Sequence, residues 1–234
     1  MIAAIDPRMP CSAKTRLKDI CEVIELPPFG ALDSRVASHP DMLIFELGGK
    51  LFLSRDYYKV AKSEIDSIIA SIGLSPVLTD DKFTSNYPGD IKFNAFTVSD
   101  FLIGNTEYIS RDLKDFASDC GIKQVKVRQG YAKCSTLVLK DAVISADKGI
   151  CDAVRAVGCD ALQISPGDVL LDGYDCGFLG GASGVYKNKI FFCGDITKHK
   201  DFESISEFSA ARGYDIISLS GEPLYDVGTI LFFE

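Results

Sequence analysis

Short apolar runs recur in pairs along the whole chain, and a tight polar turn separates the two members of each pair. The clearest pair consists of STLVL (135–139) and AVIS (142–145), which are joined by Lys140 and Asp141. Short apolar runs bounded by turn residues are typical of buried β-strands. Each pair is therefore expected to form a β-hairpin.

A polar residue, an amphipathic helix, a glycine and a third strand follow each hairpin. In the copy above, Asp147 precedes a helix expected over 148–157, Gly158 follows the helix, and residues 161–165 supply the third strand. An Asp at this place can accept hydrogen bonds from the free amides of the first helical turn. Glycine suits the left-handed conformation that closes a helix. The pattern thus predicts a repeating ββαβ unit.

Five such units account for the whole chain, so residues 1–234 are expected to form one domain. The polar residues that precede the helices recur at intervals of 42 to 50 residues: Asp6, Asp56, Asn105, Asp147 and Asp195. The fifth unit is split, because VGTILFF at the C-terminus supplies its first strand and MIAAI begins its remainder. Pairing of the two terminal strands would close a ring and protect its edges. The predicted fold class is α/β, a closed five-bladed α/β propeller.

A ring of five ββαβ units resembles the pentein superfamily, which includes arginine deiminase, agmatine deiminase, dimethylarginine dimethylaminohydrolase and the amidinotransferases. The segments SHPDM, QGYAKCSTLVLKDAVISADKGI, DGYDCGFLGGASG and LYDVGTI are also similar to an uncharacterised family assigned to that guanidine-modifying fold. The resemblance covers the whole chain. It implies a pentein-type five-bladed propeller with a ligand site in its central channel.

In penteins, the loop that enters the first strand of each unit faces the central channel. The resemblance therefore places five loops there: 37–42, 87–94, 128–134, 172–184 and 221–228. Loops held by rigid strands often carry binding and catalytic residues. The polar side chains of these loops are expected to bind a small ligand, and the candidates are Asp41, Asn94, Tyr131, Asp172, Ser183 and Asp226.

Active penteins attack a guanidinium carbon with a Cys thiolate, move protons with a His and hold the guanidinium with carboxylates. The usual cysteine position of the family, in the C-terminal first strand, has no Cys in this chain. The same cyclic order of residues occurs elsewhere, with His39, Cys134 and Asp175 in units one, three and four. The resemblance thus suggests a rotated site in which Cys134 is the nucleophile, His39 is the acid/base and Asp41, Asp175 or Asp226 anchors a cation.

Each of these residues also has a structural explanation. His39 precedes Pro40, where the chain is extended, and could shape a turn. Asp175 could cap a turn in its loop. Cys134 could be a small buried hydrophobe, and Cys176 is its nearest rival as a reactive thiol because it also lies in an axial loop.

The cysteine and histidine content predicts no metal site. The eight cysteines include no Cys-x-x-Cys pair, and the chain has two histidines, of which His199 is expected in a solvated loop. The glycines of GGASG (180–184) lack the ending of a phosphate-binding loop, so they are expected to permit close backbone approach at the ring axis. The sequence implies no organic cofactor.

The net charge of −8 and the scattered basic residues disfavour a nucleic-acid partner. No uncharged apolar run approaches the roughly 20 residues that a membrane helix needs. Asp6 and Pro7 interrupt the segment where a signal peptide would be continuously apolar. A cytoplasmic location without membrane contact is therefore expected, and the sequence leaves the oligomeric state open.

Two functions remain at this point. The first is a site for a small cationic guanidino- or amidino-type ligand, with a guanidine-modifying hydrolase or amidinotransferase as its catalytic form. The alternative is a non-catalytic pentein that serves as a binding or interaction protein, which the vacant cysteine position favours. The deciding observation is whether His39, Cys134 and Asp175 lie close together in the fold.

Overall fold

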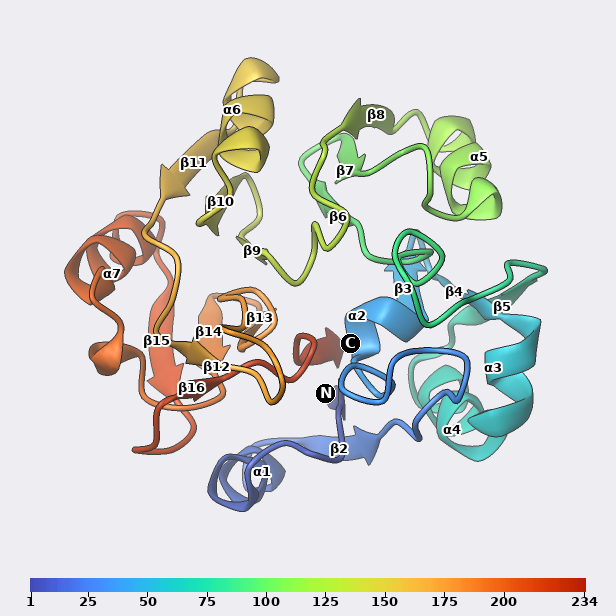
Figure 1. Ribbon diagram of the computed structural model, residues 1–234, viewed down its shortest axis with the longest axis horizontal. Helices are drawn as coiled ribbons and strands as arrows, with labels where there is room; N and C mark the ends of the chain where they lie inside the picture. Colours follow the sequence, from blue (N-terminus) through green and yellow to red (C-terminus); the bar gives the residue numbers. More distant parts are fainter.

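The computed structural model describes all residues 1–234 and shows five blades arranged in a ring (Figure 1). Each blade is a three-stranded sheet in which an antiparallel hairpin is extended by a parallel third strand. The helices lie on the outside of the ring, and the strands lie closer to its centre (Figure 1). The predicted ββαβ unit and the five-bladed propeller are thereby confirmed.

Four blades are continuous in sequence. The first contains β3 (Ile44–Leu47), β4 (Lys50–Ser54), α3 (Arg55–Val60), α4 (Lys62–Ile72) and β5 (Ser75–Thr79). The second contains β6 (Phe96–Val98), β7 (Phe101–Gly104), α5 (Arg111–Asp119) and β8 (Lys123–Lys126). The third contains β9 (Thr136–Val138), β10 (Ala142–Ser145), α6 (Lys148–Ala156) and β11 (Asp160–Gln163). The fourth contains β13 (Ser183–Tyr186), β14 (Lys189–Phe192), the short 3-10 helix η1 (Ile196–Lys198), α7 (Phe202–Ala210) and β15 (Asp215–Ser218).

The fifth blade joins the two ends of the chain. It contains β17 (Leu231–Phe233), β1 (Ile2–Ile5), α1 (Cys11–Lys18) and β2 (Glu22–Glu25). Strand β1 pairs antiparallel with β17, with Ile2 opposite Phe233, and parallel with β2. The termini meet near the centre of Figure 1. This pairing closes the ring as predicted, because without it the first and last blades would both have open edges.

The residues expected to begin the helices do so in part. Asp147 begins α6 and accepts a hydrogen bond from Ile150 N at 2.9 Å, whereas Asp195 accepts one from Thr197 N at 3.0 Å at the start of the 3-10 helix η1 and not of α7. In the first blade the prediction is wrong, because Ser54 caps α3 through Tyr57 N and Asp56 lies inside the helix. Capping needs a side-chain oxygen just before the first turn, and the serine hydroxyl already occupies that place.

Three short elements at the axis were not predicted. Helix α2 (Pro40–Leu43) lies near the centre of the ring, and strands β12 (Val169–Leu170) and β16 (Leu224–Tyr225) form a separate parallel ladder. The ladder pairs Val169 with Leu224 and thus joins the segments that lead into two of the predicted axial loops. These elements fix the backbone where the candidate site residues lie.

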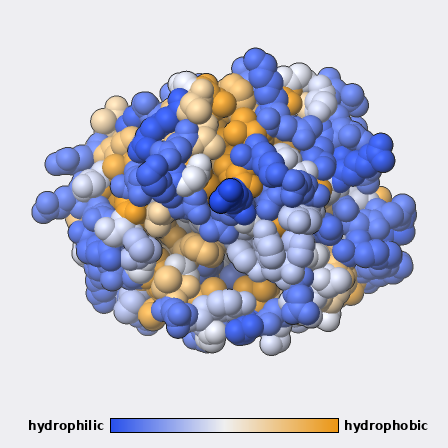
Figure 2. All heavy atoms as spheres, turned by 45° about the horizontal axis from the view of Figure 1, so that its top comes forward, coloured by the Kyte–Doolittle hydropathy of each residue, from blue (hydrophilic) through white to orange (hydrophobic).

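Apolar side chains fill the spaces between neighbouring blades. Leu137 and Ile144 of the third blade, for example, belong to one buried cluster with Ile190 and Phe192 of the fourth. Figure 2 shows a rim that is mostly hydrophilic, with hydrophobic atoms gathered toward the middle of that face. None of the helices is long and apolar enough to cross a membrane.

Candidate active site

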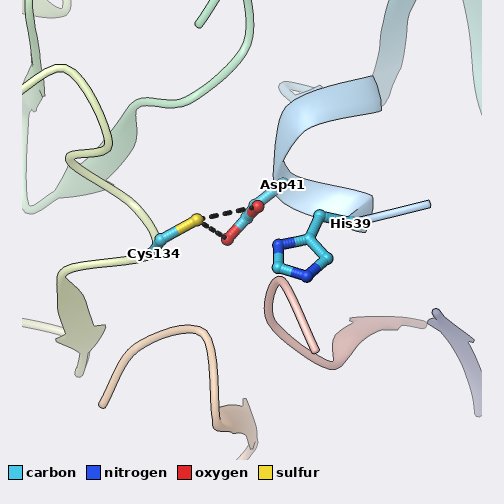
Figure 3. Close-up of side chains that lie close together, drawn as sticks. All are labelled: His39, Asp41 and Cys134. Carbon is cyan, nitrogen blue, oxygen red and sulfur yellow. Dashed lines mark hydrogen bonds between the residues drawn. The ribbon is translucent and has the colours of Figure 1, made fainter. Parts of the chain in front are cut away.

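Helix α2 brings His39 and Asp41 to the axis from one short segment (Figure 3). His39 has an extended backbone immediately before the helix, as expected for a residue that precedes a proline. Pro40 occupies the first helical position, where its missing N–H costs nothing. The Asp41 amide donates a hydrogen bond to Gly228 O at 3.1 Å, which ties α2 to the loop before β17.

Asp41 is the centre of a buried hydrogen-bond network. The Cys134 thiol lies 3.0 Å and 3.1 Å from the two carboxylate oxygens of Asp41 and donates to them (Figure 3). The Thr229 hydroxyl donates to Asp41 Oδ2 at 2.7 Å. The Asn94 amide nitrogen lies 3.1 Å from Cys134 Sγ and 3.3 Å from Asp41 Oδ1. These contacts hold the carboxylate directly against the thiol.

Cys134 lies in the turn before β9 and not on a strand. The Asn94 side-chain oxygen fixes this turn, since it accepts hydrogen bonds from Lys133 N at 2.8 Å and Cys134 N at 3.3 Å. Asn94 therefore orients the thiol through both its backbone and its sulfur. The sequence placed Asn94 among the ligand-binding candidates, and in the structure it is a buried partner of Cys134.

The His39 imidazole lies between two further carboxylates. Its Nε2 is 3.8 Å from Asp6 Oδ2, and its Nδ1 is 4.0 Å from Asp226 Oδ1. The side chain is 2% exposed, and Nδ1 has no hydrogen-bond partner. Donor atoms of His39, Asp41 and Cys134 all lie within 4.8 Å of one another. A thiol, an imidazole and three carboxylates thus meet at the axis.

Asp226 is held by two backbone amides. Its oxygens accept hydrogen bonds from Phe178 N and Gly228 N, both at 2.9 Å. Burial raises the pKa of Asp226 although these hydrogen bonds and His39 act in the opposite direction. A Cβ at Gly228, which has φ of 66°, would lie 2.1 Å from His39 Cβ, and one at Gly181 would lie 2.0 Å from Asp226 Oδ1. The predicted close backbone approach is therefore confirmed for Gly181.

The surroundings of Cys134 keep its thiol protonated. Burial raises the pKa of Cys134 well above its usual value, and the charges of Asp41 and Asp226 raise it further. Burial lowers the pKa of the adjacent Lys133, whose Nζ lies 3.4 Å from Thr136 O and from Thr229 Oγ1. The Lys133 ammonium group thus points to these two oxygens, and no hydrogen bond joins it to the Cys134 thiol.

A cavity of about 150 Å³ opens beside this cluster. Cys134, His39 and Asp226 line it together with side chains that are mostly apolar or aromatic: Val36, Met42, Tyr131, Leu171, Tyr174, Cys176 and Phe178. Tyr131 is held in place by Asp90, which accepts a hydrogen bond from its hydroxyl at 2.7 Å. The nucleophile candidate, a proton carrier and a carboxylate thus share one small cavity.

The remaining predicted site residues lie outside this cluster. Asp175 is exposed and forms no hydrogen bond or ion pair, so its predicted role as a cation anchor stays a prediction without a contact to support it. Asp172 is also exposed and lies beside Arg8 and Tyr225 at a smaller adjoining cavity, which His39 and Asp226 of the cluster also line. The hydroxyl of Ser183 is buried in β13 and donates to Gly180 O at 3.1 Å.

Sequence reasoning missed several participants. Asp6 was assigned to a helix start, yet its carboxylate pairs with Arg8 and faces His39. Thr229 carries no signal in the sequence beyond its place in the terminal loop. His199, expected in solvent, is 3% exposed, and its Nδ1 accepts a hydrogen bond from Asp201 N at 3.1 Å. Polar neighbours in sequence suggested exposure, but the side chain turns toward a second cavity of about 160 Å³.

The donor atoms of His39, Asp41 and Cys134 are of the types that bind zinc. Asp41 and Cys134 are also hydrogen-bonded to each other, so the thiol proton lies between the sulfur and the carboxylate. The sequence predicted no metal, and this is the group of side chains that could hold one.

The model of a family of unknown function, DUF6873, matches residues 4–231. The chain belongs to this family. No curated protein matches the chain in sequence. Since the family has no described activity, the site itself must carry any functional argument.

Solved structures of penteins are similar to the whole chain. A mutant of dimethylarginine dimethylaminohydrolase from Pseudomonas aeruginosa, complexed with citrulline, has a TM-score of 0.57 and 10% identity, over 94% of this chain and 91% of that chain. SxtG, an amidinotransferase from Microseira wollei, has a TM-score of 0.53 and 10% identity, over 92% and 79%. Agmatine deiminase from C. jejuni has a TM-score of 0.50 and 12% identity, over 94% and 75%. The likeness confirms the pentein fold of this DUF6873 protein.

Proposed function

We propose that this protein binds a small cationic guanidino- or amidino-type ligand at its axis and hydrolyses it with Cys134 as the nucleophile. The observation that carries the proposal is the shared cavity, which Cys134, His39 and Asp226 all line. The structural neighbours support the choice of ligand class, because they include an agmatine deiminase and an amidinotransferase.

The charges at the axis suit a planar cation. Asp226 lines the cavity, and Asp41 lies directly behind Cys134. A guanidinium presents paired N–H donors that match the two oxygens of a carboxylate. Because each acid is almost fully buried, a cation that pairs with it relieves the cost of an isolated buried charge.

In the first chemical step, the Cys134 thiol gives its proton to Asp41, which already accepts its hydrogen bond. The sulfur electron pair forms a C–S bond to the amidino carbon, and the C=N π electrons move to nitrogen. His39 then donates a proton to one nitrogen, the C–N bond breaks with its electron pair, and ammonia or an amine leaves. The product of this step is an amidino-thioether on Cys134.

In the second step, His39 takes a proton from water and the resulting oxygen attacks the same carbon. The C–S bond breaks, its electrons return to sulfur, and the proton held by Asp41 restores the thiol. The remaining hydroxyl proton passes to the released ammonia or amine, which becomes an ammonium ion, and the ligand leaves with a C=O group where the C–N bond was. One water is consumed for each ammonia or amine released, so no oxidant or reductant is needed.

The raised pKa of Cys134 fits a thiol that reacts only when a cation is bound. Without ligand, burial and the nearby carboxylates keep the thiol protonated and quiet. A guanidinium beside the sulfur adds a positive charge, which stabilises the thiolate. Reactivity would then depend on the charge of the ligand.

A pair of alkylating reagents of nearly equal shape tests this directly. Chloroacetamidine is a cation and chloroacetamide is neutral, and each loses chloride when a thiolate attacks its CH2 carbon. We expect the cationic reagent to label Cys134 first and the neutral one to label the exposed Cys11, Cys120 and Cys176 first. Peptide mass spectrometry after short exposure at neutral pH reads out the order.

Two variants serve as controls. Cys134→Ser should remove the fast label from the cationic reagent, whereas Cys176→Ser should leave it unchanged. If both reagents label the cysteines in the same order, the catalytic proposal fails and the non-catalytic alternative is left.

A further inference from the structure

We infer that the ligand of this cavity is a guanidinium or amidinium cation with an uncharged apolar tail and no carboxylate, and that Tyr174 selects it. The inference rests on the function proposed above and names the class of substrate within it. It follows from which charges face the cavity and from how its aromatic wall is held.

The ionisable side chains that line the cavity favour cations over anions. Apart from its cysteine and tyrosine side chains, they are His39 and Asp226. His39 is itself flanked by the Asp6 carboxylate at 3.8 Å. A ligand carboxylate inside this space would meet fixed negative charge and apolar side chains. Burying an anion without a partner carries a large free-energy cost.

Arg8 and Arg35 line a smaller adjoining cavity, and each pairs with a carboxylate. Arg8 pairs with Asp6 and also donates to Ser34 O at 3.0 Å. Arg35 pairs with Asp33 through Nε at 2.8 Å and Nη2 at 2.7 Å. Neither arginine belongs to the wall of the larger cavity, and each guanidinium is already neutralised by a carboxylate. Apart from His39, the cavity wall therefore provides no cation for the carboxylate of an amino-acid substrate.

Tyr174 forms an aromatic wall that a neighbouring loop holds in place. Its side chain is 43% exposed, yet its ring lines the cavity. The Arg35 guanidinium carbon lies 4.4 Å from the centre of this ring, and Arg35 Nη1 donates to Gly173 O at 3.0 Å. These two contacts join the 171–176 loop to the 33–36 segment over the cavity. An aromatic ring at this place contacts both a bound cation and an apolar tail.

Tyr131 and Phe178 line the same cavity as Tyr174. The Tyr131 hydroxyl donates a hydrogen bond to Asp90, which fixes the Tyr131 ring. The backbone amide of Phe178 donates a hydrogen bond to Asp226, which fixes the position of Phe178. The cationic end of a ligand would therefore lie at Asp226, and its tail would extend along aromatic and aliphatic side chains. Contact with these side chains then strengthens the binding of a ligand with an alkyl tail and weakens the binding of one with a charged tail.

A matched pair of probes tests the inference. Butylguanidine and 4-guanidinobutanoate share the guanidinium and a similar chain, and they differ by the carboxylate. Calorimetric titration of the Cys134→Ser protein avoids turnover. We expect butylguanidine to bind at least about tenfold more tightly. Equal or tighter binding of 4-guanidinobutanoate would overturn the inference and leave the proposed function intact, whereas binding of neither probe would overturn both.

Substitutions of tyrosine test the selecting residue. In the same Cys134→Ser protein, Tyr174→Ala should weaken butylguanidine binding about fivefold and weaken 4-guanidinobutanoate binding less, because butylguanidine has the longer apolar tail in contact with the ring. Tyr174→Phe keeps the ring and should keep the affinity. Tyr108→Ala removes a comparably exposed tyrosine away from the cavity and should change neither. An equal loss for both probes with Tyr174→Ala would show that Tyr174 does not discriminate.

Discussion

Two cysteines line the same cavity in opposite surroundings. Cys134 is 4% exposed and donates its thiol hydrogen to Asp41, while Cys176 is exposed in the 171–176 loop and lies beside a second cavity as well. Cys134 has a carboxylate, an amide and a nearby imidazole around it. Cys176 has no hydrogen-bond partner.

This difference shows that the more exposed of the two thiols is not the one with groups around it that could support catalysis. An exposed thiol can meet any electrophile but has no groups nearby to move protons or to hold a substrate. The buried thiol has both, and it also has a pKa that burial and carboxylates raise. Under the proposed function, the charge of the bound ligand switches on this buried nucleophile.

The largest expected effect concerns stability at alkaline pH. An unfolded cysteine loses its proton near pH 9.0, whereas the folded state keeps the Cys134 proton to a higher pH. Above pH 9.0 the unfolded state therefore binds fewer protons, so the free energy of unfolding falls as pH rises. Cys134 contributes up to about 1.4 kcal/mol per pH unit to this fall.

Urea unfolding measured across the alkaline range checks this. Cys134→Ala should flatten the decline by up to that amount, although Cys193, whose pKa burial also raises, retains its own contribution. Cys176→Ala should leave the slope as it is in the parent protein. Parallel curves for the parent protein and Cys134→Ala would show that the buried thiol titrates normally.

The next effect concerns the carboxylate that faces the thiol. Asp41→Asn keeps an oxygen for the Thr229 hydroxyl but removes the charge that, after burial, contributes most to the raised pKa of Cys134. We expect chloroacetamide to label Cys134 faster, because a lower pKa increases the thiolate fraction at neutral pH. Labelling of Cys176 should not change.

Asp175→Asn makes the same change of charge in the exposed loop and is the matched control. It should leave the labelling of both cysteines unchanged, because Asp175 has no contact with the cluster. If Asp175→Asn speeds the labelling of Cys134 and Asp41→Asn does not, then Asp175, and not Asp41, is the acid that slows the reaction of this thiol.

The blades could be read from the sequence because each repeats one physical pattern. Paired apolar runs such as 135–139 and 142–145 alternate with helices whose apolar positions face inward, and Gly158 closes its helix with a φ of 85°. The split fifth blade was also predictable, since β17 and β1 complete a repeat that neither terminus completes alone. Local patterns of this kind are consistent with the global fold.

The site could be predicted only in part, because its contacts join residues far apart in sequence. The resemblance to penteins placed the loops of His39, Asp41 and Cys134 near the axis, and the structure places their donor atoms within 4.8 Å of one another. The same criterion also selected Asp175, although a side chain in an axial loop can point outward into solvent. Asp6 follows a strand and was interpreted as a residue that begins a helix. Its contact with His39 forms only when the ring closes, so the local sequence pattern could not predict it.

The smallest expected effect concerns the contacts that Arg35 makes with the 171–176 loop. Arg35→Met removes the guanidinium that stacks on Tyr174 and donates to Gly173 O. Exposed contacts of this kind stabilise by about 0.5–1 kcal/mol, so butylguanidine should bind about two- to fivefold more weakly. Arg55→Met removes a comparably exposed arginine that pairs with Asp80 in the first blade and should not affect binding. If both variants bind like the parent protein, Tyr174 keeps its position without Arg35, and the aromatic wall is fixed by the packing of the 171–176 loop alone.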